Sequence, residues 1–277
     1  MAGGVRTFRE FDQGFDPVGA IRQMARRAAL FGLSMKKDIA ATDNWIRFPY
    51  YHHVFDDEKN GFERQLKYLK KFGDFISMDE ACDLLGRAQK INGRFFCVSF
   101  DDGFANCASN MVEVTRTLDI PVLIYLPTRF INMTIDRSNV EVLEVFKLKN
   151  TLPIDFLTWE QCQALLDDGV SFGSHAHQHI NLATLSDEEV YAELETSKLT
   201  IENKLDIDCE HIAIPWGRPG VDYREESTVE LARMLGYRSI ATTLRGSMDA
   251  NRHNTYRIHR DHLLANWENF QLKYFFS

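Results

Sequence analysis

Two adjacent carboxylates follow a short and mostly apolar run of this chain. Residues 95–100 read F-F-C-V-S-F, which predicts a strand buried on both faces of a sheet, and Asp101-Asp102-Gly103 comes directly after it. Two like charges this close raise the pKa of one carboxyl unless a cation lies between them. A strand that ends in a tight turn is one interpretation of Asp-Asp-Gly. A bound metal ion is the other, and it requires further ligands elsewhere in the chain.

Three of the nine histidines lie within five residues, at His175, His177 and His179, directly after a predicted strand over residues 170–174. On an extended strand, positions i and i+4 lie roughly 13 Å apart, which is awkward for two imidazoles that bind one ion at about 2 Å. A helical turn after Ser174 shortens this rise to about 6 Å and places His175 and His179 on one face, with His177 pointing elsewhere. Two histidines and one carboxylate with an open position are typical of a catalytic zinc site. A solvated histidine-rich loop is the alternative.

The order of these motifs resembles a known family. S-F-D-D-G followed by G-S-H-A-H-Q-H is similar to the first two motifs of the NodB-homology polysaccharide deacetylases, carbohydrate esterase family 4. The resemblance runs from about residue 45 to about residue 262 and includes Y-H-H-V at 51–54, L-T-W-E at 157–160 and I-P-W-G at 214–217. It implies a divalent metal ion, most often zinc with cobalt or nickel as alternatives, held by Asp102, His175 and His179. It also implies that Asp101 is the general base.

The same resemblance gives the third motif, at residues 214–217, a role in binding the substrate. The backbone N–H of Trp216, between Pro215 and Gly217, would stabilise the oxyanion of the tetrahedral intermediate, and we expect these three residues to bind substrate. Many members carry an arginine two residues before the proline, and that arginine orients the general base. This chain has Ala213 there, so Asp101 lacks an assigned partner, and Arg218 is the substitute we consider.

A histidine near the last strands is the family's proton donor to the departing amine. We assign this role to His259, with His262 as the alternative. A structural strand histidine is the competing interpretation of His259. His52 matches a Tyr-His element that lines the pocket in related enzymes.

The elements that must position these residues alternate in type along the chain. We predict strands at residues 45–54, 75–76, 95–100, 121–126, 170–174, 211–216, 237–243 and 256–260. Helices are predicted near residues 62–72, 78–85, 111–118, 158–168, 186–205, 227–235 and 263–276, and residues 128–153 as a long irregular loop. Alternation of this kind implies a parallel sheet with functional residues at the carboxyl ends of the strands. The resemblance implies an α/β fold, a distorted (β/α) barrel of about seven strands, which we adopt; a doubly wound open sheet is the alternative.

Residues 1–44 lie outside the resemblance and form a predicted N-terminal helical extension to a barrel domain over residues 45–277. A helix within residues 17–37 places apolar side chains on one side, at Ile21, Met24, Ala25, Ala28 and Phe31, with arginines and lysines interspersed. We expect this helix to pack against its own domain. A basic amphipathic helix lying on an anionic membrane is the alternative.

The composition of the chain excludes some classes of binding partner and some cellular settings. A formal net charge of −8 argues against a nucleic-acid partner, whose binding depends on lysine and arginine. Five cysteines without a C-x-x-C motif predict reduced thiols rather than a disulfide framework. No run of about 18 apolar residues and no signal peptide is visible, so we expect a cytoplasmic protein without a transmembrane segment.

These expectations lead to a functional hypothesis. The chain is predicted to be a metal-dependent hydrolase that removes an N-acetyl group from an amino sugar. Because no export signal is visible, we expect a nucleotide- or lipid-linked precursor in cell-surface polysaccharide biosynthesis. One alternative is a deformylase of a lipid-linked amino sugar, and another is a catalytically silent carbohydrate-binding barrel.

Overall fold

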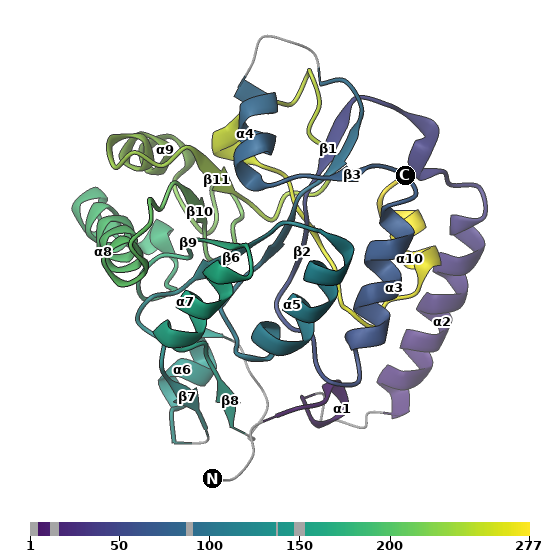
Figure 1. Ribbon diagram of the computed structural model, residues 1–277, viewed down its shortest axis with the longest axis horizontal. Coiled ribbons are helices and arrows are strands. Elements are labelled where there is room, and N and C mark those ends of the chain that lie inside the picture. Colours follow the sequence, from purple (N-terminus) through teal and green to yellow (C-terminus); the bar gives the residue numbers. More distant parts are fainter. Residues whose placement is uncertain (1–4, 12–16, 87–90, 137, 147–152) are drawn as a thin grey trace.

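Seven parallel strands form a curled sheet at the centre of the protein (Figure 1). The computed structural model describes residues 5–11, 17–86, 91–136, 138–146 and 153–277. The strand order is β11 (Ser239–Ala241), β10 (His211–Ala213), β9 (Val170–Ser174), β6 (Val122–Leu126), β5 (Val98–Phe100), β2 (Pro49–Tyr51) and β12 (Asp261–His262). The predicted fold class, a distorted (β/α) barrel of about seven strands, is confirmed.

The segment that ends in β12 joins the two edges of this sheet. The Ile258 N–H donates to the Ile240 carbonyl on one edge, and the Asp261 N–H donates to the Phe48 carbonyl on the other, each over 2.9 Å. Arg260 lies between these two contacts and is buried, with 1% of its surface exposed. The closure of the barrel therefore brings the Arg260 side chain into the interior.

Two predicted strands are each divided into two short ones. In a separate three-stranded sheet, β4 (Arg94–Phe96) lies between β1 (Trp45–Arg47) and β3 (Asp74–Phe75) and pairs with both. Phe48 and Cys97 mark the breaks, after which β2 and β5 enter the seven-stranded sheet. The predicted strands over 45–54 and 95–100 are thus correct in type but pass from one sheet to the other.

Helices cover the outside of the sheet, as Figure 1 shows for α3, α5 and α7. They are α3 (Lys59–Leu69), α4 (Met78–Gly86), α5 (Asn106–Leu118), α7 (Trp159–Asp167), α8 (Asp187–Leu205) and α9 (Glu225–Met234). Thr158 and Ser186 form capping boxes with Gln161 and Glu189, so these two helix starts are confirmed.

Three predicted elements differ from the structure. The strand predicted over 256–260 is wrong, because the Asn254 side chain caps a short 3₁₀ helix, η3 (Thr255–Arg257), and the paired strand β12 follows it. The last helix, α10 (Asn269–Phe275), begins later than predicted, since Glu268 caps it. The predicted irregular loop contains α6 (Val140–Val145) and a small antiparallel pair of β7 (Thr134–Ile135) with β8 (Ile154–Asp155); residues 137 and 147–152 of this loop lie outside the described residues.

The N-terminal extension contains α1 (Phe8–Phe11), α2 (Pro17–Ser34) and the 3₁₀ turn η1 (Ile39–Ala41). Helix α2 lies beside α10 (Figure 1), and the buried residues Leu30 and Ser34 lie on consecutive turns of one side of it. Ile21 and Met24, which we expected to pack inward, are 67% and 72% exposed. The helix therefore packs against its own domain, as expected, with the Phe31 ring 5.5 Å from that of Phe270 in α10, whereas Ile21 and Met24 stay mostly exposed.

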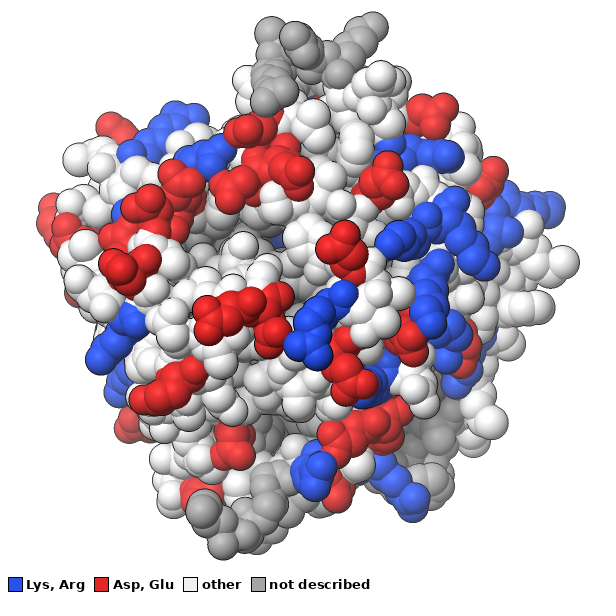
Figure 2. Space-filling view, viewed as in Figure 1, with Lys and Arg blue, Asp and Glu red and all other residues white. Residues whose placement is uncertain are grey.

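The structure also bears on the expectations for the cysteine thiols and for membrane-spanning helices. All five cysteines are buried and free, as predicted. Within the described residues, no helix has the length and apolar character needed to cross a membrane. Figure 2 shows acidic and basic side chains interspersed on one face, with lysine and arginine gathered toward the side where α2 and α3 lie in Figure 1.

Candidate active site

Asp102, His175 and His179 meet at the carboxyl ends of β5 and β9. The Asp102 Oδ1 atom lies 3.4 Å from His175 Nε2 and 3.3 Å from His179 Nε2. All three residues are buried, and one ligand atom from each lies within 4.8 Å of the other two. The structure thus brings together the three residues that the sequence indicated as metal ligands.

The segment that carries the histidines, residues 175–179, is a turn stabilised by hydrogen bonds. The backbone φ angles of Ala176 and His179 are 58° and 52°, in the left-handed region, so the predicted helical turn after Ser174 is wrong. Glu193 of α8 accepts the backbone N–H groups of residues 177 and 178 over 3.0 and 2.9 Å. This turn brings the two imidazoles together without a helix. Glu193 was missed by the sequence because it lies on the next helix along the chain.

His177 points away from the pair, as expected. Its Nδ1 atom lies 2.9 Å from the Thr128 hydroxyl. It therefore helps to hold the turn and is not one of the grouped ligands.

The tautomer of His175 is fixed by the backbone. Its Nδ1 atom lies 2.7 Å from the Ala213 carbonyl, and since a carbonyl only accepts, Nδ1 carries the hydrogen and Nε2 presents a lone pair. The Asp102 Oδ1 atom is buried and has no hydrogen-bond partner among the described residues. Two imidazole nitrogens and one carboxylate oxygen fit a divalent cation such as zinc.

Asp101 is held by a buried arginine. The guanidinium of Arg260 donates two hydrogen bonds to the Asp101 carboxylate, over 2.7 and 2.8 Å. Burial, the largest single influence, would raise the pKa of Asp101, but the charge and hydrogen bonds of Arg260 together with the nearby His175 and His52 outweigh it, and the pKa lies below the ordinary value. Arg260 is itself fixed, because its Nε donates to the Thr242 carbonyl over 3.0 Å and its guanidinium lies 4.1 Å above the Tyr50 ring.

Arg260 is a residue of the candidate site that the sequence did not reveal. Ala213 lacks a side chain that could reach Asp101, and Arg218, the substitute we considered, pairs with Asp222 over 2.8 and 2.9 Å instead. The arginine comes from the opposite end of the chain, where the barrel closes. Its only sequence signal is an arginine within the run R-I-H-R-D-H at 257–262.

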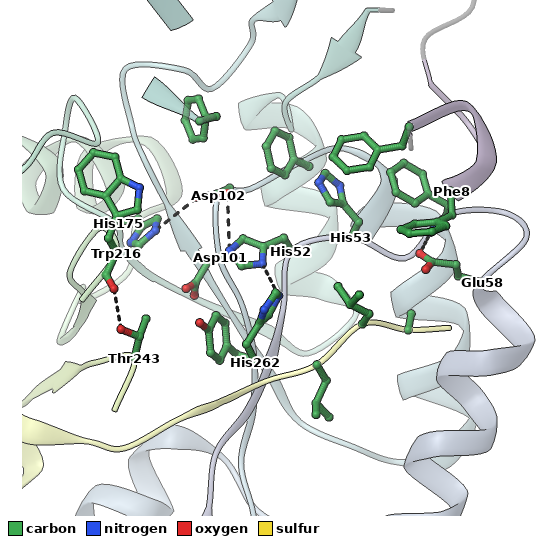
Figure 3. Close-up of a pocket in the computed structure, with 18 of the residues that line it drawn as sticks. Phe8, His52, His53, Glu58, Asp101, Asp102, His175, Trp216, Thr243 and His262 are labelled. Atoms are coloured by element: carbon green, nitrogen blue, oxygen red, sulfur yellow. Dashed lines mark hydrogen bonds and ion pairs between the residues drawn. The ribbon is translucent and has the colours of Figure 1, made fainter. Parts of the chain in front are cut away.

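Two histidines approach the other side of Asp102. His52 Nε2 lies 3.8 Å from Asp102 Oδ2, and His52 Nδ1 lies 3.0 Å from His262 Nε2 (Figure 3). Burial, with the neighbouring charge of His52, lowers the pKa of His262 to about 3. The ring of His259, our first assignment for the proton donor, faces the Arg245 carbonyl at 3.2 Å and does not line the pocket. The geometry therefore favours the alternative, His262, together with His52.

The third motif forms a tight turn beside the histidines. The Gly217 N–H donates to the Pro215 carbonyl over 2.7 Å, and Trp216 has a φ of 56°. The Trp216 ring centroid lies 5.1 Å from that of His179, and the Thr243 hydroxyl donates to the Trp216 carbonyl over 2.6 Å. Gly217 is required here, because its φ is 62° and an added Cβ would lie 3.0 Å from the Thr243 nitrogen.

Asp101, Asp102, the histidines of the two pairs and Trp216 face one cavity of about 520 Å³. Its polar end is lined by Tyr50, His52, Asp101, Asp102, His175, His179, Trp216, Arg218, Thr243 and His262. Its other end is lined mainly by apolar and aromatic side chains, at Phe8, Phe11, His53, Phe55, Glu58, Phe104, Leu263, Leu264 and Ala265, and Phe146 lines the cavity against the His179 ring. A pocket of this size and composition is suited to a small-molecule or sugar-sized substrate.

Comparison with known proteins places this geometry in a family. A sequence model described as "Polysaccharide deacetylase" matches residues 89–240. The Bacillus subtilis (strain 168) protein named "Putative polysaccharide deacetylase YxkH" is 25% identical over 203 residues, which is 73% of this chain. The chain spans 63% of the length of that relative.

Solved structures of deacetylases share the fold. The Streptococcus pyogenes deacetylase PplD in complex with acetate superposes with a TM-score of 0.66 at 20% identity, over 85% of this chain and 99% of PplD. IcaB from Ammonifex degensii gives a TM-score of 0.66 at 18% identity, over 84% of this chain and 97% of IcaB. The family model covers Asp101, Asp102, His175, His179 and the third motif, whereas His52, Arg260 and His262 lie outside the matched residues. On the strength of that match, this chain belongs to the polysaccharide deacetylase family.

Proposed function

We propose that this chain is a divalent-metal-dependent hydrolase that removes the N-acetyl group from an amino sugar of a cell-surface polysaccharide or its precursor. The observation that carries the proposal is the buried group of Asp102, His175 and His179 directly beside an Asp101 whose carboxylate is held by Arg260. Three ligands with a neighbouring general base are the parts needed for metal-assisted amide hydrolysis. A silent carbohydrate-binding barrel would need none of them.

The metal ion that we propose is zinc, with cobalt or nickel as alternatives, and Asp102, His175 and His179 would hold it. When bound, such an ion polarises the amide carbonyl and a water molecule. Asp101 takes the proton of the attacking water, and its lowered pKa keeps it ionised and able to accept that proton at neutral pH. Arg260 is proposed as the positioning residue that fixes the Asp101 carboxylate.

Trp216 is proposed to stabilise the oxyanion through its backbone N–H, as the resemblance to the family implies. Pro215 and Gly217 fix the turn that carries this group.

The His52–His262 pair is proposed to protonate the departing amine. His262 has its pKa lowered to about 3, so it is neutral at pH 7 and its Nε2 can accept the Nδ1 hydrogen of His52. This leaves the His52 Nε2 atom, the one nearer Asp102, to carry the proton that is donated.

Acetate release tests this proposal. The purified chain, loaded with zinc, cobalt or nickel, should release acetate from N-acetylated amino sugars, and His179→Ala should lose both metal and activity. Release of formate from N-formyl amino sugars in place of acetate would support the deformylase alternative. If the wild-type chain bound no more metal than His179→Ala and released neither acetate nor formate, the proposal would be contradicted.

A further inference from the structure

The cavity continues away from Asp102 between a row of aromatic rings. The centroid distances are 4.6 Å from His179 to Phe146, 5.8 Å from Phe146 to Phe104, 4.4 Å from Phe104 to His53 and 4.8 Å from His53 to Phe11. The ring contacts are therefore unbroken from a proposed metal ligand to the N-terminal segment. We call the part of the cavity beyond the His52–His262 pair, toward Phe8 and Phe11, the aromatic arm.

Apolar surface is left open inside this arm. Phe8 and Phe11 line the cavity while only half-buried, and Leu264 is 37% exposed. The polar ring among them, that of His53, is uncharged at neutral pH, because burial lowers its pKa to about 3. An open apolar lining that continues from a polar reaction centre is typical of a binding site for an apolar group.

Charge in the cavity does not favour an anionic group in the arm. Among the described residues, Arg218 is the one lysine or arginine that lines the cavity, and it follows Trp216 at the metal-site end, where Asp222 neutralises it. Glu58 lies beside Phe8 at the far end in Figure 3, and it accepts the Phe55 N–H over 3.3 Å. A phosphate or nucleotide would find no cation in the arm, whereas a hydrocarbon or aryl group would match its lining.

The arm lies on the side of the sugar. His52 and His262 face the departing amine in the proposed reaction, and the chain runs from them directly into the arm, through His53 on one side and Leu263 and Leu264 on the other. The sugar that carries this amine must lie against the same pair. A group attached to the sugar would therefore enter the arm.

We propose that the aromatic arm binds an apolar group, a hydrocarbon chain or aryl group, attached to the amino sugar whose amide is hydrolysed. The substrate is then an amphiphile: a polar sugar at the metal site and an apolar carrier between Phe8, Phe11 and Leu264. This assignment rests on the proposed function for the side on which the sugar lies. Phe8 and Phe11 precede the barrel and the residues matched by the family model, so the N-terminal segment acts as a specificity element.

A substrate ladder, meaning a series of glycosides whose apolar group increases in length, tests the proposal on the metal-loaded full chain. N-acetylglucosamine and its methyl, butyl and octyl glycosides differ only in the length of the apolar group. We expect kcat/KM for acetate release to rise roughly two- to fourfold per methylene until the arm is filled. The same ladder in calorimetric binding gives a readout that does not need turnover, and the octyl glycoside should bind at least tenfold more tightly than the methyl glycoside.

Two variants locate the effect. In the Phe8→Ala/Phe11→Ala double variant, the octyl-to-methyl ratio of affinities and of kcat/KM should fall at least fivefold. The matched control is Phe31→Ala, which removes an aromatic ring of the same N-terminal segment that is 56% exposed and does not line the cavity; its ratio should stay at the wild-type value. Should the double variant fold poorly, Phe8→Ser alone with the wild-type ladder gives the same comparison.

Each outcome decides between the proposals. If neither affinity nor kcat/KM changes with the length of the apolar group, the aromatic-arm proposal is overturned and the deacetylase proposal stands. Chain-length-dependent binding without acetate release supports the arm and overturns the deacetylase proposal. A rise in kcat/KM with longer N-acyl groups, and not with longer glycosides, overturns the arm by placing the apolar group on the acid side of the amide.

Discussion

Asp101 and Asp102 are neighbours in the chain with different partners. Asp101 faces Arg260, and Asp102 faces two imidazoles. The backbone at Asp102 has a φ of 70°, in the left-handed region, and this turns its carboxylate away from that of Asp101. Two adjacent aspartates can therefore take separate roles, one as a base and the other as a ligand.

This difference predicts different losses in the two asparagine variants. Asp101→Asn should keep its metal and lose turnover by roughly two to four orders of magnitude, the range for general acid–base catalysis. Asp102→Asn should lose metal affinity as well. Metal analysis and acetate release on both proteins check this. Turnover that survives in Asp101→Asn would show that the base lies elsewhere.

Arg260 can be tested separately from Asp101. Arg260→Lys keeps the positive charge but loses the bidentate hydrogen bonds to Asp101. We therefore expect kcat to fall roughly tenfold to a hundredfold with KM little changed. Arg260→Met leaves a buried carboxylate without a partner and should cost about 3–5 kcal/mol of unfolding free energy. An equal fall in kcat for the exposed control Arg116→Lys, whose arginine pairs with Asp168 away from the cavity, would argue against a special role for Arg260.

Glu58 predicts a pH dependence of stability. Burial raises its pKa to about 7 from an ordinary value of 4.5. The folded state thus holds this proton more tightly than the unfolded state. Its contribution to stability is complete below pH 4.5 and is lost as the pH rises to about 7, on the order of 3 kcal/mol. Urea unfolding of wild type and Glu58→Gln at pH 5 and pH 7.5 should show this loss only in the wild type. The exposed control Glu230→Gln should behave as the wild type, and a parallel pH profile for Glu58→Gln would contradict the assignment.

Helix α2 packs with only part of its predicted apolar side, because the Phe31 ring contacts that of Phe270 in α10 while Ile21 and Met24 are mostly exposed. Leu30 is 9% exposed and faces the contact with α10, while Met24 is 72% exposed. We expect Leu30→Ala to lower the unfolding free energy by about 2 kcal/mol. Met24→Ala should change it by less than about 0.5 kcal/mol. Chemical denaturation of both variants checks the orientation, and a larger loss in Met24→Ala would reverse it.

At the scale of the whole molecule, a bound ion would join strands that are distant in the chain. Asp102 follows β5, and the two histidines follow β9, so metal binding couples to the stability of the barrel. Saturating zinc at about 100 times its Kd should add about 2.7 kcal/mol. The melting temperature should rise with zinc, fall after chelation and be insensitive to zinc in His179→Ala. His177→Ala is the control that should keep the response, and a zinc response retained in His179→Ala would contradict the ligand set.

Most of the elements and the grouping of the ligands could be predicted from local patterns in the sequence. Short apolar runs and helical spacing, with caps at Thr158 and Ser186, are local signals, and each can be found without knowledge of the fold. The strand-end positions of Asp101 and Asp102 and the spacing of His175 and His179 also follow from local chemistry. These features therefore agree with the structure.

The contacts between residues from opposite ends of the chain could not be predicted from local sequence. Arg260 reaches Asp101 from 159 residues away, and His262 meets His52 from 210 residues away. The side of α2 that packs depends on α10, near the opposite end of the chain. Phe8 and Phe11 enter the cavity because the N-terminal segment lies beside the start of α3 (Figure 1). Such contacts depend on how the last strand segment closes the sheet, and no local pattern of residues specifies that closure.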